Sequence, residues 1–472
     1  MRILLLAMPD TVSALDAVTT MPNLGLASIA GSVAGHDVSI ADLAFFRRNL
    51  TAKITSIIRR VRPDVIGLSA MSFQYASACR VARIVRTAAP GTPVVLGGYH
   101  ATLMYEEIAS GNDRDIFDFL IRGEGETSFA ALIRAIGSGQ RYTNIPGLSY
   151  RSNGVFHHNR PSMLMDLVKL PLPDRGARIL DRSRFLGMRF DCVETSRGCT
   201  MGCRFCSITE MYGRRIRYFP IPRIIEELTQ LKRRGVGGVF FVDDNITLDV
   251  RRLGTLCEAI IDARLDTLMY VTQASVRGIC ADSSLPQLLA RAGFRWVFLG
   301  IENQSARNLS SLGKAHEPGD AVRAVSVLRR NGIGVFGGFI VGNPDDTRDD
   351  IAAAFRDALE SGVDHPIMQC LTPYPKTGTR DDLTRAGLIT NGDDFSRYNG
   401  FIANVRTKSL SNSELAKAIL VEGVKLYFNP KLIIRSRFWR FHPSLWLPLL
   451  ANNIRFIIGA LGGKLFASRH SW

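Results

Sequence analysis

The sequence predicts an α/β protein with two largely parallel sheets, one in each half of the chain. Three observations support this. Short apolar segments alternate with helical segments along most of the 472 residues. A chain of this length exceeds one ordinary hydrophobic core, so two or three domains are expected. A polar stretch containing Pro161, Pro171 and Pro173 separates the two alternating regions and predicts a linker at about residues 151–184.

The first region, residues 1–150, predicts a doubly wound, flavodoxin-like sheet. Its short apolar runs are bounded by turn residues, and helical stretches at 25–33 and 76–87 lie between them. The expected strands are Ile3–Leu6, Val38–Ile40, Asp64–Leu68, Pro93–Leu96 and Asp118–Ile121. In such sheets a ligand binds beyond the carboxyl ends of the strands.

Glycines and small polar residues gather at those expected strand ends. They are Ser69, Ser72, Gly97, Gly98, Thr102, Gly123 and Gly125. Glycine lets a backbone approach a bulky ligand closely, so these seven are candidate binding residues. Ordinary strand-to-helix turns use the same residue types, and spacing alone favours that simpler interpretation.

The most informative stretch contains Cys199, Cys203 and Cys206 in a Cys-x3-Cys-x2-Cys spacing. Thiolates are the ligands of iron–sulfur clusters, and three on one loop leave one iron of a four-iron cluster open to a reacting molecule. A zinc site is the competing interpretation, but no fourth ligand follows at a matching spacing. Cys192 is close in sequence, yet it falls on an expected strand. The pattern therefore favours a [4Fe–4S] cluster.

Residues 185–385 predict a partial barrel of six strand–helix units, with polar residues at the strand ends. Strands are expected at Gly238–Val242, Leu268–Thr272, Trp296–Leu299 and Val335–Val341, with helices at Ile221–Arg234, Leu285–Ala292 and Pro318–Asn331. The strand ends supply Asp243, Asp244, Asn245, Glu302, Gly338, Ile340 and Gly342. Each of these fits a barrel turn when taken alone, and an Asp-Asp-Asn turn often caps the following helix.

The cysteine loop, including Phe205 before the third cysteine, resembles the signature of the radical S-adenosylmethionine superfamily. The resemblance implies that the open iron chelates S-adenosylmethionine and that one electron, from reduced flavodoxin or ferredoxin, yields a 5′-deoxyadenosyl radical. It also implies cofactor contacts. Phe205 contacts S-adenosylmethionine, the 243–245 turn contacts its methionine ammonium, Glu302 contacts the ribose or nearby polar groups, and Gly338, Ile340 and Gly342 flank the adenine.

Four strings in the first region resemble the cobalamin-binding domain fused to many radical enzymes. They are residues 22–26 (PNLGL), 35–37 (GHD), 96–100 (LGGYH) and 122–126 (RGEGE). The resemblance implies that the seven strand-end residues bind cobalamin. The Asp-x-His-x-x-Gly motif that supplies a lower axial histidine is absent, as it is in some relatives. A degenerate domain that binds nothing is the alternative.

Residues 372–377 (TPYPKT) and 395–400 (FSRYNG) resemble the branch that includes the anaerobic magnesium-protoporphyrin ester cyclase and the hopanoid C-methylases. The resemblance implies a radical enzyme that methylates an unactivated carbon of a lipid or isoprenoid. An oxidative cyclase or rearrangement enzyme acting on a tetrapyrrole or other polycyclic molecule is the alternative. Outside enzymes, the remaining alternative is an iron–sulfur protein that senses redox state or binds a tetrapyrrole.

The formal charge of +16 indicates an anionic partner. Residues 386–472 are expected to form a helical extension, and after Glu422 it contains eight Lys and Arg, no Asp or Glu, and three of the four tryptophans. This mixture suits an anionic membrane surface better than docking on the barrel, and better than nucleic acid. The apolar run Leu445–Phe466 is interrupted by polar residues, and there is no transmembrane run, secretory signal or disulfide framework. We therefore expect a cytoplasmic protein, peripheral at the inner face of the membrane.

Overall fold

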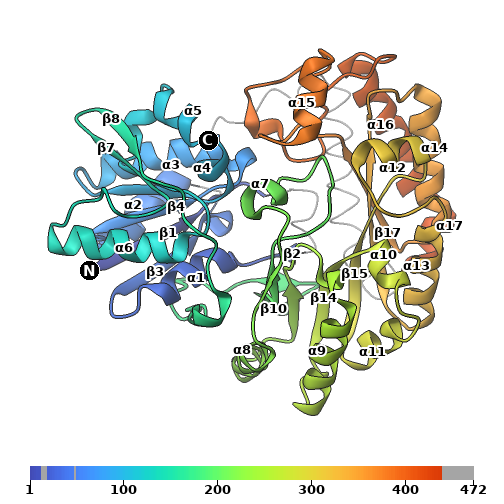
Figure 1. Ribbon diagram of the computed structural model, residues 1–472, viewed down its shortest axis with the longest axis horizontal. Helices are drawn as coiled ribbons and strands as arrows, with labels where there is room; N and C mark the ends of the chain where they lie inside the picture. The colour runs from blue at the N-terminus through green and yellow to red at the C-terminus, as the bar shows by residue number, and fades with distance from the viewer. Residues whose placement is uncertain (12–18, 47–48, 438–472) are drawn as a thin grey trace.

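The computed structural model describes residues 1–11, 19–46 and 49–437. These residues form two large β-sheets that lie side by side with helices packed on them (Figure 1), and a separate two-stranded sheet. One sheet belongs to the N-terminal region and the other to the region that carries the cysteine loop. The expected α/β class with two sheets is confirmed.

The N-terminal sheet has seven strands in the order β3-β1-β4-β5-β6-β7-β8, of which the first five are parallel. Those five are β3 (Asp37–Asp42), β1 (Arg2–Ala7), β4 (Val65–Ser69), β5 (Val94–Gly97) and β6 (Phe119–Ile121). Helices α1 (Leu24–Ser32) and α6 (Gly125–Ser138) pack on one face, and α2 (Leu50–Val61) and α3 (Tyr75–Ala88) on the other. Because both faces are covered, the central strands are apolar throughout.

The N-terminal sheet extends past residue 150, which corrects the expected start of the linker. Strands β7 (Leu148–Ser152) and β8 (Val155–His158) form an antiparallel hairpin on its edge. Strand β8 has almost no signal in the sequence, because only Phe156 of its four residues is buried. Farther along, Arg175 and Arg178 form buried ion pairs with Asp191 of the second sheet at 3.2 and 2.6 Å, so this part of the chain is fixed to the barrel.

The second sheet contains six consecutive parallel strands, which confirms a partial barrel in place of a closed one. The strands are β10 (Met188–Val193), β13 (Gly238–Phe241), β14 (Met269–Ser275), β15 (Phe294–Glu302), β16 (Gly334–Val341) and β17 (His365–Cys370). Two short strands, β9 (Arg184–Phe185) and β2 (Thr19–Thr20), extend the β10 edge.

Helices cover the convex side of the barrel sheet and bury the largest hydrophobic core of the described residues. They include α8 (Ile221–Arg233), α9 (Val250–Asp262), α11 (Leu285–Arg291), α13 (Asp320–Arg330) and α14 (Arg348–Glu360). A separate cluster of Phe185, Phe190, Val271 and Trp296 lies near the amino ends of the strands. Apolar packing therefore fills that end, and the polar strand ends lie at the other.

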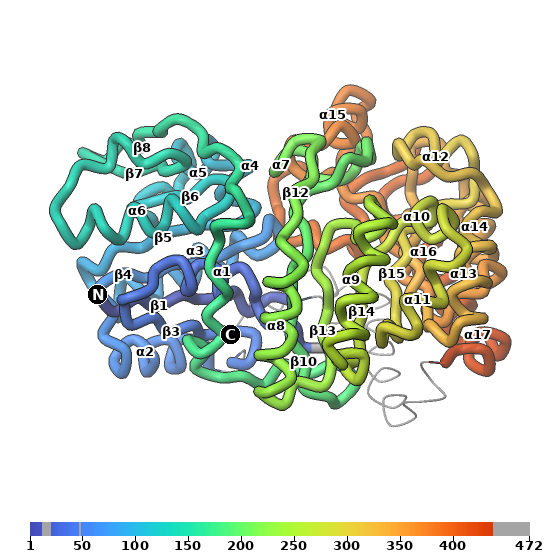
Figure 2. The backbone as a smooth tube through the Cα atoms, turned by 60° about the horizontal axis from the view of Figure 1, so that its bottom comes forward, coloured from blue at the N-terminus to red at the C-terminus, as the bar shows by residue number. Residues whose placement is uncertain are grey.

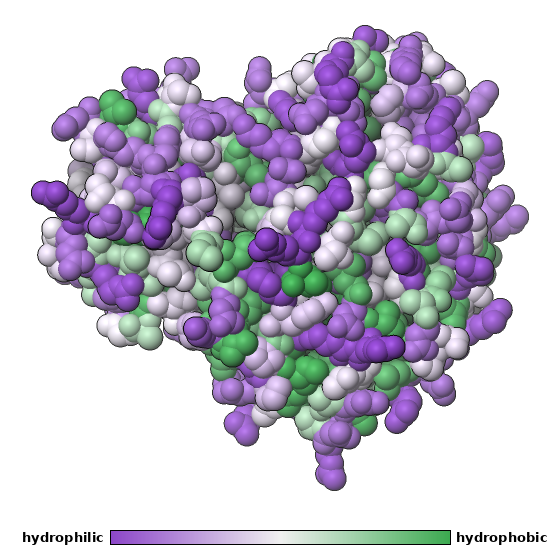
Figure 3. Space-filling view, in the orientation of Figure 1, coloured by the Kyte–Doolittle hydropathy of each residue, from purple (hydrophilic) through white to green (hydrophobic). Residues whose placement is uncertain are grey.

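The C-terminal part adds α15 (Gly378–Arg385), α16 (Asn412–Tyr427), which contacts α14, and α17 (Pro430–Arg435). No helix among the described residues is long and apolar enough to cross a membrane. The run Leu445–Phe466 and most of the basic, aromatic tail lie outside the described residues. Hydrophilic residues cover most of the face seen in Figure 3, with hydrophobic residues showing mainly along its middle.

The two halves meet where α4 (Tyr99–Leu103), which follows β5, contacts α7 (Ile208–Tyr212), which follows the third cysteine. Both views place α4 and α7 next to each other (Figures 1 and 2). The carboxyl end of a strand in the N-terminal sheet thus lies beside the cysteine loop of the other half.

Candidate functional site

The three cysteines lie on one loop that is closed at its neck by a pair of short strands. Strand β11 (Ser196–Arg197) pairs antiparallel with β12 (Arg217–Tyr218). At the neck Gly198 has φ of +89°, and a side chain there would collide with the carbonyl oxygen of Arg215. Only glycine fits this position without strain.

Other elements support the loop from outside. The amide of Arg204 donates to the carbonyl of Leu312, the last residue of α12 (Ala306–Leu312), at 3.0 Å. The amide of Thr379 in α15 donates to the carbonyl of Arg204, also at 3.0 Å. Gly313 packs directly on the carbonyl oxygen of Gly202. The cysteine loop is therefore fixed at its middle as well as at its neck.

The thiols of Cys199, Cys203 and Cys206 are all partly buried. Burial raises the pKa of each, that of Cys206 to about 12, so without a metal these groups are neutral thiols at neutral pH. In the described part of the chain no three His, Cys, Asp or Glu side chains converge on one metal ion. A four-iron cluster needs a different arrangement, with one thiolate for each of three irons, and this donor set fits it.

The turn that follows β13 gives its three residues three different environments. Asp243 is buried, and its carboxylate accepts from the amide and hydroxyl of Thr195 at 3.1 and 2.7 Å and from the hydroxyl of Ser196. Asn245 accepts from the amide and hydroxyl of Thr247 and so caps the next turn of helix. The capping interpretation of the turn is thus correct for Asn245.

Asp244 differs from its neighbours because it is only partly buried and points towards the cysteine loop. Its carboxylate accepts from the amide of Gly198 at 3.0 Å. Burial and the nearby charge of Asp243 raise its pKa to about 6. Of the two carboxylates in this turn, that of Asp244 is the more open to a ligand.

Glu302 forms a buried ion pair that the sequence did not reveal. The ammonium of Lys314 lies 2.9 Å from its carboxylate, and the two side chains are 7% and 10% exposed. Both groups lie over the bare backbone of Gly300. Glu302 itself has φ of +63°, at a point where the pairing of β15 with β16 shifts register. A non-glycine residue held in this conformation at a strand end is typical of a functional site.

Lys314 follows directly after Gly313, which packs on the cysteine loop. Although burial opposes its charge, Glu302 and the thiol of Cys203 raise its pKa. The loop thiols therefore have a buried cation beside them. A lone lysine after a helix gives no sequence signal of this kind, because its significance depends on three segments meeting in space.

The glycine motif of β16 has a local explanation at two of its three positions. A side chain at Gly338 would lie 2.7 Å from the ring of Phe298, so that ring covers the bare backbone there. Gly342 has φ of +83°, and its amide donates to Asp346 at 3.0 Å. Ile340 is buried, and Phe205 packs partly buried against the barrel core. These contacts leave a role at the adenine as a proposal.

The expected cobalamin residues divide into two sets. Thr102 donates its hydroxyl to the carbonyl of Gly98 at 2.9 Å and accepts from the amide of Gly123 at 3.0 Å, which ties together the turns after β5 and β6. A side chain at Gly98, Gly123 or Gly125 would meet the chain's own atoms within 3.0 Å. Ser72 is buried as well. The chain's own packing explains this first set.

Ser69 and Gly97 form the second set, at the carboxyl ends of β4 and β5. Both are partly exposed, and a side chain at Gly97 would meet nothing closer than 3.9 Å. Open backbone at adjacent strand ends of a doubly wound sheet is where such folds bind ligands. This edge therefore fits the approach of a bulky group such as cobalamin.

Three tyrosines that were not among the expected site residues lie on or beside the cysteine loop. Tyr212 belongs to the loop itself, and Tyr99 and Tyr374 lie next to it. Burial raises the pKa of Tyr99 and Tyr212, and that of Tyr374 to about 12. The thiolate form of Cys206 adds to this effect at Tyr99 and Tyr374, and the carboxylate of Asp244 adds to it at Tyr99 and Tyr212. Tyr99 comes from the N-terminal half, so this half contributes directly to the surroundings of the cysteine loop.

Comparison with known families identifies the class of protein. Residues 11–133 match the B12 binding domain, and residues 193–358 match the radical SAM superfamily. The chain is therefore a radical S-adenosylmethionine enzyme with a cobalamin-binding domain. These matches confirm both resemblances found in the sequence, and with them cobalamin and S-adenosylmethionine as cofactors.

The similarity to individual proteins extends over nearly the whole chain. The chain is 31% identical over 441 residues to the uncharacterized methyltransferase PH0819 of Pyrococcus horikoshii. This alignment covers 92% of this chain and 94% of that protein. The chain belongs to the same family.

Two further relatives have more specific names. The anaerobic magnesium-protoporphyrin IX monomethyl ester cyclase of Rubrivivax gelatinosus is 25% identical, with 79% of this chain and 67% of the cyclase aligned. The hopanoid C-3 methylase of Methylococcus capsulatus is 28% identical, with 78% and 70% aligned. The solved structure of the cobalamin-dependent radical enzyme OxsB shares the fold, with a TM-score of 0.72 at 15% identity, over 99% of this chain and 82% of OxsB.

Proposed function

We propose that this enzyme transfers a methyl group to an unactivated carbon of a lipid or isoprenoid substrate. The observation that carries the proposal is the meeting of the two halves, where Tyr99 at the carboxyl end of β5 lies beside the cysteine loop. When bound, the cluster and S-adenosylmethionine supply a hydrogen-abstracting radical, and cobalamin supplies the methyl group. Overall, one C–H bond of the substrate would become C–CH3. The hydrogen would end on 5′-deoxyadenosine, formed with methionine from one S-adenosylmethionine. The methyl group would come, by way of cobalamin, from a second S-adenosylmethionine that leaves as S-adenosylhomocysteine, and the reductant would supply two electrons.

The chain's own residues position these partners. Cys199, Cys203 and Cys206 would each bind one iron of the cluster. The partly exposed carboxylate of Asp244 would accept a hydrogen bond from the methionine ammonium of S-adenosylmethionine. The Lys314–Glu302 pair offers charges of both signs beside the cysteine loop, and these would suit the polar groups of the same ligand. Ser69 and Gly97 leave room for cobalamin at the facing edge.

The phenols around the loop would exclude water from the radical. Because burial raises their pKa values, Tyr99, Tyr212 and Tyr374 remain protonated at neutral pH. They offer aromatic surface and neutral hydroxyls, and these suit a largely apolar substrate. The relationship to a hopanoid methylase supports the same substrate class.

The experiment uses anaerobically reconstituted protein, cobalamin, a reductant, S-adenosylmethionine with a deuterated methyl group, and an isoprenoid lipid extract. We expect 5′-deoxyadenosine together with a lipid product that has gained one labelled methyl group. The Cys203→Ala variant serves as the inactive control. No 5′-deoxyadenosine from wild-type protein with a full cluster would refute radical catalysis.

Oxidative cyclisation is the second candidate, and the relationship to the magnesium-protoporphyrin cyclase supports it. The mass of the product separates the two reactions. A tetrapyrrole product that has lost hydrogens or gained oxygen, without the label, would refute methylation and favour the cyclase.

We also propose that the basic, aromatic tail binds an anionic membrane. Its composition carries this proposal, because the residues from 438 onward lie outside the described structure. A deletion that tests it should begin at residue 438, since Leu432 is buried and the amide of Arg437 donates to Asp364 at 3.0 Å. Wild-type protein should sediment with vesicles that contain phosphatidylglycerol. Equal sedimentation of the truncated protein would contradict the proposal.

A further inference from the structure

Two arginines at the neck of the cysteine loop contact the same carboxylate of the N-terminal domain. Arg197 and Arg217 are opposite each other in the β11–β12 pair. Arg197 donates to Glu124 at 3.1 Å, and Arg217 donates to both carboxylate oxygens of Glu124 at 2.8 and 2.9 Å. One glutamate thus joins the two strands that close the loop.

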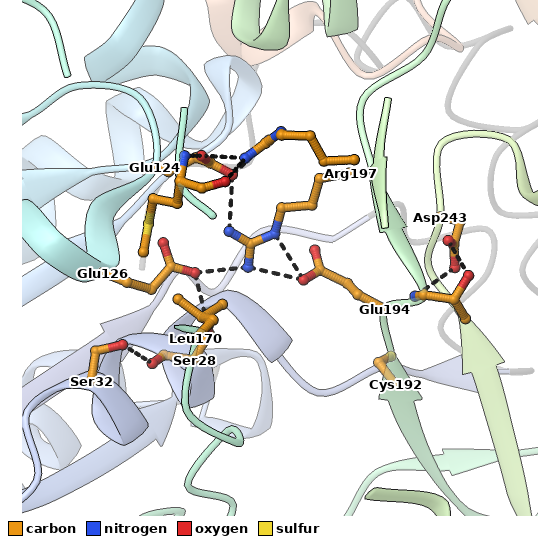
Figure 4. Close-up of polar contacts among 12 residues, drawn as sticks. Ser28, Ser32, Glu124, Glu126, Leu170, Cys192, Glu194, Arg197 and Asp243 are labelled. Carbon is orange, nitrogen blue, oxygen red and sulfur yellow. Dashed lines mark hydrogen bonds and ion pairs between the residues drawn. The ribbon is translucent and has the colours of Figure 1, made fainter. Parts of the chain in front are cut away.

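A second glutamate from the same turn reinforces this contact. Arg197 donates to Glu126 at 2.7 Å, and the hydroxyl of Ser28 donates to the same carboxylate oxygen at 2.8 Å. On the other side of the guanidinium, Glu194 accepts at 2.9 and 3.0 Å. Figure 4 shows the guanidinium of Arg197 held between Glu124 and Glu126 on one side and Glu194 on the other.

These charges are buried, which distinguishes them from a surface ion pair. The side chains of Arg197, Glu124 and Glu126 are 7%, 3% and 6% exposed. Burial alone would raise the pKa of Glu126, but Arg197 lowers it below its ordinary value. Buried ion pairs add little net stability compared with apolar packing, but they favour one geometry strongly. Their presence at this interface therefore points to a need for a fixed geometry.

We propose that Glu124 and Glu126 are positioning residues that hold the cysteine loop in a fixed position against the cobalamin-binding domain. This inference rests on the proposed function, because a fixed position matters only if both cofactors act on one substrate. The loop is supported on its far side by α12 and α15. The two glutamates supply the support that comes from the N-terminal half.

The chain offers a matched control in a second ion pair between the two halves. Lys376 lies 2.8 Å from Glu107, and both side chains are nearly half exposed. An exposed pair of this kind contributes little to structure. Glu107→Gln thus removes a carboxylate from the same interface without touching the loop.

The first test needs no cofactor. Hydrogen exchange of peptides that cover residues 196–218 should be about tenfold faster in Glu124→Gln and in Glu126→Gln, since each loses charge-assisted hydrogen bonds to Arg197. Exchange in β13 should stay unchanged, and Glu107→Gln should behave like wild type. Unchanged exchange at 196–218 would overturn the proposal, and so would an equal rise in β13, which would indicate a general loss of stability.

The second test measures position in the reconstituted holoenzyme. The reduced cluster should speed the spin relaxation of cob(II)alamin in wild type and in Glu107→Gln. In Glu124→Gln and Glu126→Gln this effect should weaken, and Glu126→Asp should recover part of it. Equal relaxation in all variants would refute a positioning role. These tests can be told apart from a failure of the proposed function. In that case wild-type protein would form no 5′-deoxyadenosine, whatever the hydrogen-exchange results of the variants.

Discussion

Gly198→Ala should open the neck of the cysteine loop while leaving the two sheets folded. An alanine at φ of +89° costs roughly 1–2 kcal/mol. Its Cβ would also lie well under 3.0 Å from the carbonyl oxygen of Arg215, so the neck would have to separate. Accommodating this Cβ in the closed neck costs about a further 1–3 kcal/mol. The sum, about 3 kcal/mol, lowers the closed population of the loop about a hundredfold.

Gly213→Ala provides the control within the same loop. Gly213 also has a positive φ, +65°, but a side chain there would meet nothing within 4 Å. It should lose only the conformational term, about 1 kcal/mol. Iron and sulfide per chain after anaerobic reconstitution measure the outcome, with thermal unfolding as a check on the fold. We expect a full cluster in Gly213→Ala and a largely lost one in Gly198→Ala. A full cluster in both would refute the reasoning about the neck.

Three further predictions concern the cluster, its buried cation and the linker. Cys203→Ala should lose most of the cluster's visible absorbance, and a retained four-iron complement would contradict the ligand assignment. Lys314→Met should leave the Glu302 carboxylate buried without its cation, at a cost of about 3–5 kcal/mol in stability. It should therefore lower both the yield of the cluster and the binding of S-adenosylmethionine, whereas Lys314→Arg should preserve most of both. Burial opposes ionisation of Asp191, yet Arg178 and Arg175 lower its pKa below 3.8. Its stabilisation of the folded protein is therefore present above about pH 4 and lost as the pH falls further. The unfolding free energy of Asp191→Asn should therefore change less with pH than that of wild type below about pH 4.

The sequence was sufficient for features that depend on local pattern. Alternating apolar and helical segments predicted the parallel strands of both sheets, because a strand covered on both faces must be apolar along its length. The spacing of Cys199, Cys203 and Cys206 predicted their common loop. It was not sufficient for β8, whose single buried side chain leaves no periodic signal. Nor could it reveal Lys314 or Arg197, because their ion-pair partners are distant in sequence. Glu302 lies over ten residues from Lys314, and Glu126 lies over seventy residues from Arg197.

The Asp243–Asn245 turn and the glycines at the strand ends show the same limit of sequence patterns. In both cases the residue types suit a ligand, but most of them satisfy contacts within the protein. Asp243 binds Thr195, Asn245 caps a helical turn, and Gly98 allows two turns to approach closely. A motif therefore points to a candidate turn, whereas the choice of the residue that would contact a ligand depends on which polar groups remain open. By that criterion Asp244 and Gly97 are the positions at which substitution should affect cofactor binding most and folding least.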